Sequence, residues 1–121
     1  MKEQTTLLHR RLILLVTRLN ESGYSSIKLH QQNKRKENMS LEGGIGRLYV
    51  QPSANGYDVS LSGASIEHLM TKQLEELFGR IPDGYKQTNA TKGFKKQPYW
   101  RTDNFSHVEV VSEMYARLGR H

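Results

Sequence analysis

The sequence predicts an α+β fold, a single compact domain in which three helices pack on a small antiparallel sheet. Three segments repeat apolar residues at the spacing of one helical face, and shorter segments alternate apolar and polar residues as half-buried strands do. The length of 121 residues is typical of one domain with one core. We expect the order α-β-β-β-α-loop-β-α over residues 1–121, with no internal repeat and no second domain.

The first helix is expected at residues 3–21. Gly23 is suited to end it, because glycine readily adopts the left-handed conformation that follows many helices. A short strand is expected at residues 25–29, whereas residues 31–38 lack apolar periodicity and predict an exposed loop. The apolar stripe of the helix consists of Leu8, Leu12, Leu15, Val16 and Leu19.

A β-hairpin is expected from strands at residues 48–50 and 57–61. The second strand alternates Tyr57, Val59 and Leu61 with polar residues, so one of its faces should be buried. Asn55-Gly56 predicts a connecting loop of about five residues with positive φ angles. The glycine-rich run at 43–46 leads into a strand instead of a helix, which favours a flexible or bulged start of that strand over a phosphate-binding loop.

The second helix should begin at a Ser65 cap and end at Gly79. A turn at residues 81–84 should follow, then loop or edge structure at 85–97 and a short strand at 99–102. The apolar stripe of this helix, expected to be buried, consists of Ile66, Leu69, Met70, Leu74, Leu77 and Phe78.

The third helix shows two signals for its start. Ser106 and Glu109 have the spacing of a capping box, and Phe105 and Val110 have that of a hydrophobic staple. Gly119 should end the helix. Its stripe consists of Phe105, Val108, Val111, Tyr115 and Leu118.

Composition excludes several classes of function. The chain has no cysteine, which excludes disulfides, thiolate metal sites and cysteine nucleophiles and agrees with a reducing compartment. The densest apolar run, residues 12–16, is far shorter than the ~20 residues of a membrane-spanning helix, so we expect no membrane partner, no secretion and a cytoplasmic location. The formal net charge of +6 agrees either with a polyanionic partner or with a charge that mainly keeps the protein soluble.

Candidate catalytic and metal-binding residues are few. The five histidines include no pair at metal-ligand spacing on one helical face, so no metal and no cofactor are expected. Asp103 and His107 could form an oriented pair, but at a helix start a capping role is favoured over catalysis. We expect no catalytic residue and, on balance, no enzyme.

Residues 80–101 carry the most informative pattern. They hold six cations against the single acid Asp83, interleaved with four aromatic residues. Lysine and arginine neutralise phosphates, and exposed aromatic rings stack on unpaired bases. A second basic cluster at residues 34–36 could reach the same ligand. The expected nucleic-acid-binding residues are Lys86, Lys92, Lys95, Lys96 and Arg101, assisted by Lys34, Arg35 and Lys36.

A structural explanation of the same segment also stands. Phe94 and Trp100 could be core anchors while the lysines are merely solvated, and we favour the core for Trp100. The leading hypothesis is a non-enzymatic nucleic-acid-binding or nucleic-acid-associated module. The alternatives are an adaptor that binds an acidic protein through the same surface, and a small nuclease or toxin-like enzyme with His107 or His30 as general base.

Several segments together resemble the YjbR/MmcQ-like family. They are the strand at 57–61, the helix ending at Phe78, the Pro-Asp-Gly-Tyr turn at 82–85, the Trp-bearing run at 96–102 and the last helix at 112–118. The resemblance implies a compact α+β domain with a double-wing sheet, described as DNA-binding-like and without an assigned enzymatic activity. It further implies a structural role for Trp100, a ligand-facing role for Lys96 and no catalytic residue. The chain differs from the family pattern at Tyr99, where a histidine is usual.

Overall fold

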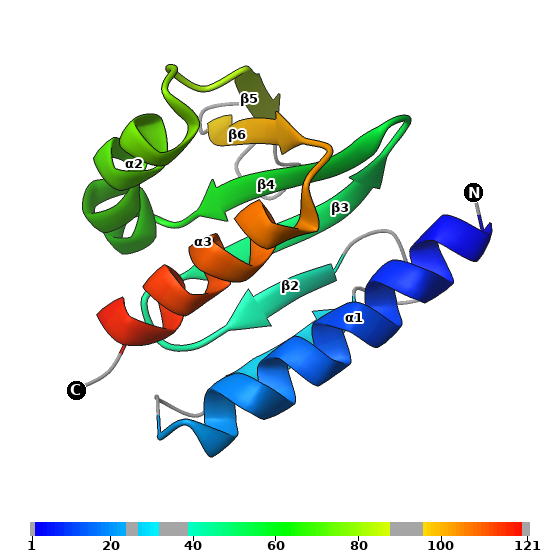
Figure 1. Cartoon of the computed structure of the whole chain (residues 1–121). Coiled ribbons are helices and arrows are strands. Elements are labelled where there is room, and N and C mark those ends of the chain that lie inside the picture. The colour runs from blue at the N-terminus through cyan, green and yellow to red at the C-terminus, as the bar shows by residue number, and fades with distance from the viewer. Residues whose placement is uncertain (1, 24–26, 32–38, 88–95, 120–121) are drawn as a thin grey trace.

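The computed structural model describes residues 2–23, 27–31, 39–87 and 96–119. Within these residues the chain forms three helices and a six-stranded antiparallel sheet with strand order β1-β2-β3-β4-β6-β5 (Figure 1), which confirms the predicted α+β class. None of the helices has the length and apolar character needed to cross a membrane in the part of the chain described. The elements are α1 (Lys2–Glu21), β1 (Lys28–Gln31), β2 (Met39–Glu42), β3 (Arg47–Ser53), β4 (Gly56–Ser62), α2 (Ala64–Phe78), β5 (Gly84–Gln87), β6 (Lys96–Thr102) and α3 (Phe105–Leu118).

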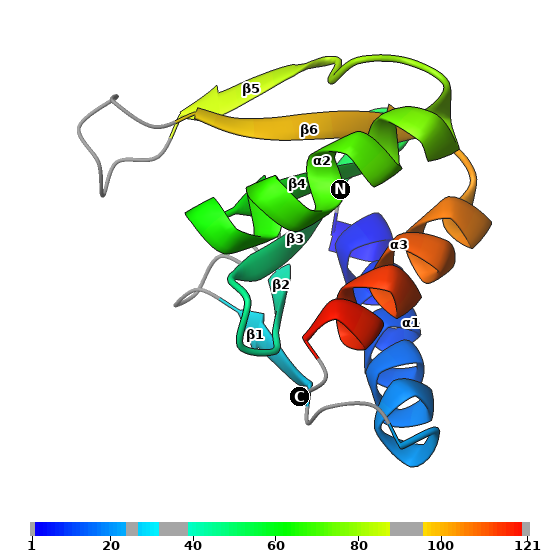
Figure 2. The ribbon, with the colours of Figure 1, turned by 90° about the vertical axis from the view of Figure 1, so that its left-hand side faces the viewer.

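The helices cover one face of the sheet. In Figure 1 α1 and α3 lie in front of the sheet, and in Figure 2 they lie to its right. The buried side chains of α2 belong to the same core. Strand register explains why this face is apolar, since directly opposed residues share a face. One fully buried row across four strands consists of Met39, Val50, Val59 and Trp100, and the next consists of Leu41, Leu48 and Leu61.

The first strands differ from their prediction. β2 begins directly after the segment expected to be an exposed loop, and its four-residue length gave no clear periodic signal. β3 and β4 are longer than expected and are joined by residues 54–55 alone, so the five-residue loop was wrong. Gly56 is not a positive-φ glycine but the first residue of β4. A side chain there would collide with the carbonyl oxygen of Thr102 on β6.

The glycine-rich turn between β2 and β3 is anchored from α3. Gly44 and Gly46 have positive φ angles of 104° and 121°, values that favour glycine. The hydroxyl of Tyr115 donates to the carbonyl oxygen of Gly46, and burial is the main reason that the Tyr115 pKa is raised to about 12. The turn leads into β3, as the sequence predicted.

The start of α2 is not at Ser65. Gly63 occupies the N-cap position with φ 126° and makes no side-chain capping bond. It is the only residue between β4 and α2, and a positive φ there lets the chain reverse direction within one residue. Leu69, expected in the core, is 38% exposed, whereas Ile66, Met70 and Leu74 are buried as predicted. The helix ends at Gly79 in the left-handed conformation, also as predicted.

The start of α3 also differs from its prediction. The cap is Asn104, whose Oδ1 accepts a hydrogen bond of 2.9 Å from the backbone N–H of Ser106. The expected Ser106 cap and the Phe105–Val110 staple were therefore wrong. Phe105 is the first helical residue and packs edge-on against Tyr57, with ring centroids 5.4 Å apart, and Val110 is exposed. The predicted stripe is otherwise correct, since Val108, Val111 and Tyr115 are fully buried.

Candidate functional site

The polar face of the sheet, opposite the helices, is the candidate site, and we call it the open face. It arises from the same alternation that builds the core, because each strand directs every second side chain away from the helices. A central row runs across it through Ser40, Tyr49, Ser60, Tyr99 and Gly84. A parallel row contains Gln51, Asp58 and Arg101. The open face therefore carries two tyrosines in one row, with a carboxylate and cations beside them.

Asp58 is the centre of a charged cluster on the open face. Only 4% of the residue is exposed. Its carboxylate accepts bonds of 2.8 and 3.1 Å from Nε and Nη2 of Arg101, and it lies 3.0 Å from Nζ of Lys86. Lys86 also donates to Oε1 of Gln51 at 2.6 Å. We call Gln51, Asp58, Lys86 and Arg101 the Asp58 cluster.

Burial and pairing act in opposite directions on the acidity of Asp58. Desolvation is the largest single influence and raises the pKa of the carboxyl group. The hydrogen bonds from Arg101 and Lys86, together with their charges, outweigh it and leave the pKa below its ordinary value. Asp58 is therefore held as a carboxylate by these two cations.

The Asp58 cluster also contacts Tyr99. Nζ of Lys86 lies 5.2 Å from the centroid of the Tyr99 ring, and Cζ of Arg101 lies 5.7 Å from it, within cation–π range. The ring leans over Gly84, where an added Cβ would be 2.8 Å from Cε1 of the ring. The backbone at Gly84 must therefore lack a side chain to leave room for Tyr99.

The contact between Lys86 and Gln51 shows that the sheet curls toward the open face. Lys86 is on β5 and Gln51 is on β3, with β6 and β4 between them. In a flat sheet their Cα atoms would be about 14 Å apart across the strands and about 13 Å along them, which is more than two extended side chains can bridge. The 2.6 Å hydrogen bond therefore requires β5 and β6 to bend toward β3 over the open face.

The same curl agrees with the burial of small polar residues in the central row. Ser60 lies between Tyr49 and Tyr99 in the register and is fully buried, and so is Ser40. Neither hydroxyl oxygen has a hydrogen-bond partner among the described residues. Buried hydroxyl groups usually have a hydrogen-bond partner. The central row is therefore polar, and two of its hydroxyl groups have hydrogen-bonding capacity that the described residues do not use.

The structure brings two of the sequence-predicted binding residues together, namely Lys86 and Arg101. Lys96 is the first residue of β6, paired with Gln87, and its side chain is outside the described part. The remaining predicted residues lie outside the described ranges: Lys34, Arg35, Lys36, Lys92 and Lys95.

The two basic segments attach to the sheet far from each other. Residues 32–38 follow Gln31 of the edge strand β1, next to the start of β2. Residues 88–95 connect Gln87, at the end of the opposite edge strand β5, to Lys96, at the start of β6. Lys96 lies four residues along β6 from Trp100, whose row also contains Met39. Their points of attachment are at opposite edges of the sheet and about four residues apart along the strands.

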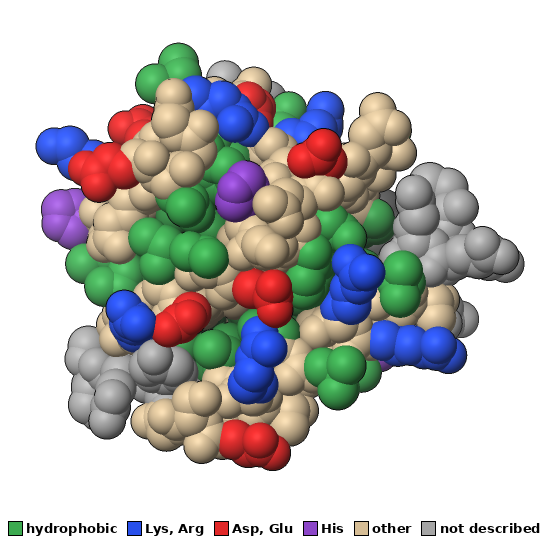
Figure 3. Space-filling model, viewed as in Figure 1, with side chains coloured by type: hydrophobic (Ala, Val, Ile, Leu, Met, Phe, Trp, Pro, Cys, Tyr) green, Lys and Arg blue, Asp and Glu red, His purple; other side chains and the backbone are tan. Residues whose placement is uncertain are grey.

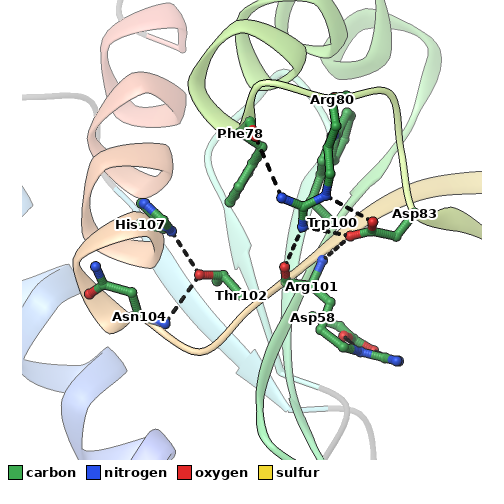
Figure 4. A network of polar contacts seen from close by, with 9 residues as sticks. All are labelled: Asp58, Phe78, Arg80, Asp83, Trp100, Arg101, Thr102, Asn104 and His107. Atoms are coloured by element: carbon green, nitrogen blue, oxygen red, sulfur yellow. Dashed lines mark hydrogen bonds and ion pairs between the residues drawn. The ribbon is translucent and has the colours of Figure 1, made fainter.

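Trp100 belongs to the core, as we expected. It is fully buried, stacks on Phe78 with ring centroids 6.1 Å apart, and donates from Nε1 to the carbonyl oxygen of Arg80 at 3.1 Å. Figure 4 shows the ring among these neighbours. Tyr85, by contrast, is 57% exposed, and Phe94 lies outside the described residues.

Arg80 and Asp83 form a second polar network that fixes the backbone beside Trp100 (Figure 4). The guanidinium group of Arg80 donates twice to Asp83, at 2.9 and 2.8 Å, and once to the carbonyl oxygen of Arg101 at 2.6 Å. Asp83 in turn accepts from the backbone N–H of Arg101 at 2.7 Å. The hydrogen bond from Arg80 is the main cause of the lowered pKa of Asp83. Arg80 thus serves to join the turn after α2 to β6.

The Asp103–His107 pair is not formed. Nδ1 of His107 lies 2.7 Å from the hydroxyl oxygen of Thr102, and the imidazole ring packs edge-on against Phe78. Asp103 is exposed. Across the described ranges, no group of three histidine, aspartate or glutamate residues could hold a metal ion.

Tyr49, Gln51 and Asp58 are site residues that sequence reasoning did not select. Each lies in a strand whose alternation could have assigned it to the polar face, but only the strand pairing shows that β6 lies beside β4. We compared the chain with family models, with curated proteins and with solved structures, and none of them matches it.

Proposed function

We propose that this chain is a non-enzymatic module that binds single-stranded nucleic acid through the open face. The observation that carries the proposal is the row in which Tyr49 and Tyr99 flank Ser60, with Lys86 and Arg101 beside it. Aromatic side chains on a sheet face that none of the described helices covers offer stacking surfaces to unpaired bases, and neighbouring cations neutralise the backbone. A duplex has no unstacked bases to offer, so single strands fit this surface better.

The distribution of charge supports the same surface. The open face carries Lys86 and Arg101 around one carboxylate, and Arg47 of β3 beside Glu42. Both basic segments that the sequence singled out are attached at its edges. On the helix side, acidic and basic side chains are interspersed with apolar ones (Figure 3). A polyanion would be attracted to the open face more than to the helix side.

The geometry gives less support to an enzyme. His107, the first candidate for a general base, packs against Phe78 of α2 and pairs with Thr102. His30 stands in the same row as Ser40 and Tyr49 on the open face, but at the opposite edge of the sheet from Lys86. Among the described residues, neither histidine lies beside Lys86 and Arg101, the two described cations that the proposal assigns to phosphate.

Salt-dependent binding tests the proposal. Fluorescence anisotropy should show that an oligothymidylate of about twelve nucleotides, within the usual site size, binds more tightly than a duplex of the same length. If about four phosphates are neutralised, log Kd should change with log salt with a slope of magnitude about 3. The double variant Lys95→Ala/Lys96→Ala should reduce this magnitude by about 1 to 2. It should also lower the affinity for oligonucleotides of unrelated sequence nearly equally, because phosphates are the same in all of them.

A control variant and a competing ligand complete the test. Arg10→Ala/Lys72→Ala removes two exposed cations from α1 and α2 and should leave the slope nearly unchanged. Tyr49→Leu should weaken the binding of oligothymidylate, because it removes a stacking ring while retaining apolar cover. No binding at low salt would eliminate the open face as a nucleic-acid site. Tight binding of polyglutamate with no binding of oligonucleotides would favour the acidic-protein adaptor instead.

A further inference from the structure

We infer that Asp58 is an internal counter-anion of the open face, and that a phosphate of the bound strand replaces it on Arg101 and Lys86. This inference rests on the proposed function and concerns the control of affinity at the same site. It predicts that the charge of Asp58 weakens nucleic-acid binding, although Asp58 lies among the residues that favour it.

Asp58 and Gln51 together occupy four of the eight N–H donors of the two cations. Asp58 takes the Nε–Nη2 edge of Arg101, which is the geometry with which a guanidinium group binds a phosphate. Lys86 uses donors on both Gln51 and Asp58, out of the three that an ammonium group has. A phosphate that is to bind this Nε–Nη2 edge of Arg101 must therefore displace Asp58.

The same contacts occupy the stacking surface. While Asp58 holds them, Lys86 and Arg101 lie within 5.2 and 5.7 Å of the centre of the Tyr99 ring. A base that stacks on the part of the ring that these cations contact must displace them. If the two cations turned toward a phosphate, their donors would pass from Asp58 to the phosphate, and the ring of Tyr99 would be uncovered in the same movement.

Exposure shows which partner can move. The side chain of Arg101 is 57% exposed, whereas that of Asp58 is 6% exposed. The guanidinium group can therefore turn outward to a ligand, but the carboxylate cannot follow it into water. When the ligand binds, the buried carboxylate of Asp58 is less well paired with Arg101 and Lys86, and this raises the free energy of the bound state. In the variant Asp58→Asn this charge is absent, so Lys86 and Arg101 can turn to a phosphate at a lower free-energy cost.

The test compares Asp58→Asn with wild type in the oligothymidylate assay. The variant should bind roughly tenfold more tightly at low salt, and the magnitude of its salt slope should rise by about 0.7 for each additional phosphate contact. Glu109→Gln is the matched control. It removes one carboxylate from an exposed ion pair with Arg18 between α1 and α3, so it changes net charge equally and should raise affinity less than twofold.

A measurement on the wild-type protein covers the case in which Asp58→Asn does not fold. The Nε–H resonance of Arg101, assigned with the variant Arg101→Lys, should shift during titration with oligothymidylate as Nε exchanges a carboxylate for a phosphate. If wild type binds while the variant binds no better and the Arg101 resonance stays fixed, the inference is overturned and the proposed function stands. If neither protein binds oligothymidylate, both fail.

Discussion

Nε1 of Trp100 donates a hydrogen bond of 3.1 Å to the carbonyl oxygen of Arg80. The donor belongs to β6, and the acceptor belongs to the turn that follows α2. The guanidinium group of Arg80 reaches back to the carbonyl oxygen of Arg101, so backbone and side chain of Arg80 both bind β6. The indole therefore joins two distant segments in addition to filling the core.

The substitution Trp100→Ala should lower the free energy of unfolding by about 3–5 kcal/mol, because it empties a fully buried site. Trp100→Phe should cost less, about 1–3 kcal/mol, since it retains a ring but leaves the Arg80 carbonyl group without its donor. Urea unfolding measures both values. If Trp100→Ala kept wild-type stability and lost only the binding of oligonucleotides, the core role of Trp100 would be wrong.

Two leucines of α2 should respond differently to truncation. Leu74 is fully buried, so Leu74→Ala should destabilise the fold by about 2–5 kcal/mol. Leu69 is 38% exposed, and Leu69→Ala should cost less than about 1 kcal/mol. Both variants make the same chemical change in one helix, so each is a control for the other. Equal midpoints of thermal unfolding would contradict the orientation of α2.

The cap of α3 can be tested in the same way. Asn104→Ala removes the oxygen that accepts from the N–H of Ser106 and should destabilise the protein by about 1 kcal/mol. Ser106→Ala keeps this backbone donor and should change stability by less than about 0.5 kcal/mol. Chemical denaturation of the two variants distinguishes the assignments, and a larger effect at position 106 would restore the cap that the sequence suggested.

The sequence predicted the structure well where a long apolar pattern repeats, and less well where contacts between distant segments determine the local conformation. The stripes of α1 and α3 were predicted closely, because five apolar residues at helical spacing leave little ambiguity. The starts of α2 and α3 were not, because several residue types near each start could act as caps. Asn104 and Ser106 are both good caps, and only the backbone conformation distinguishes them. The strand β2 is four residues long and was missed, since so short a segment has almost no periodicity, and the equally short edge strand β5 was expected only as loop or edge structure.

The candidate site was predicted only in part for a related reason. Lys86 and Arg101 were selected from their charge, which is visible in the sequence. Their common partner Asp58 was not, because it is remote from both in sequence and meets them only when β4 pairs with β6 and β5 curls over the face. Charge alone therefore indicated two cations as free binding groups, while the folded chain supplies an anion to both.

The ion pair between Arg80 and Asp83 should make stability depend on acid pH. The hydrogen bond from Arg80 lowers the pKa of Asp83 in the folded protein below its ordinary value near 3.8. A group whose folded pKa is lowered contributes stability that is present above the unfolded pKa and is lost as the pH falls through the folded pKa. The contribution should be modest, because both side chains are partly exposed.

A double-mutant cycle isolates this contribution. Asp83→Asn and Arg80→Gln should each destabilise the protein at neutral pH, and the double variant should lose less than their sum. The coupling free energy from urea unfolding should stay constant from neutral pH to about pH 5 and decline below about pH 4, as Asp83 takes up a proton in the folded state. A high salt concentration should reduce the coupling at every pH at which it is present, since the pair is reached by solvent. Coupling that persisted unchanged into strong acid would mean that the neutral hydrogen bonds around Asp83, including the one from the backbone of Arg101, hold the turn to β6 without the ion pair.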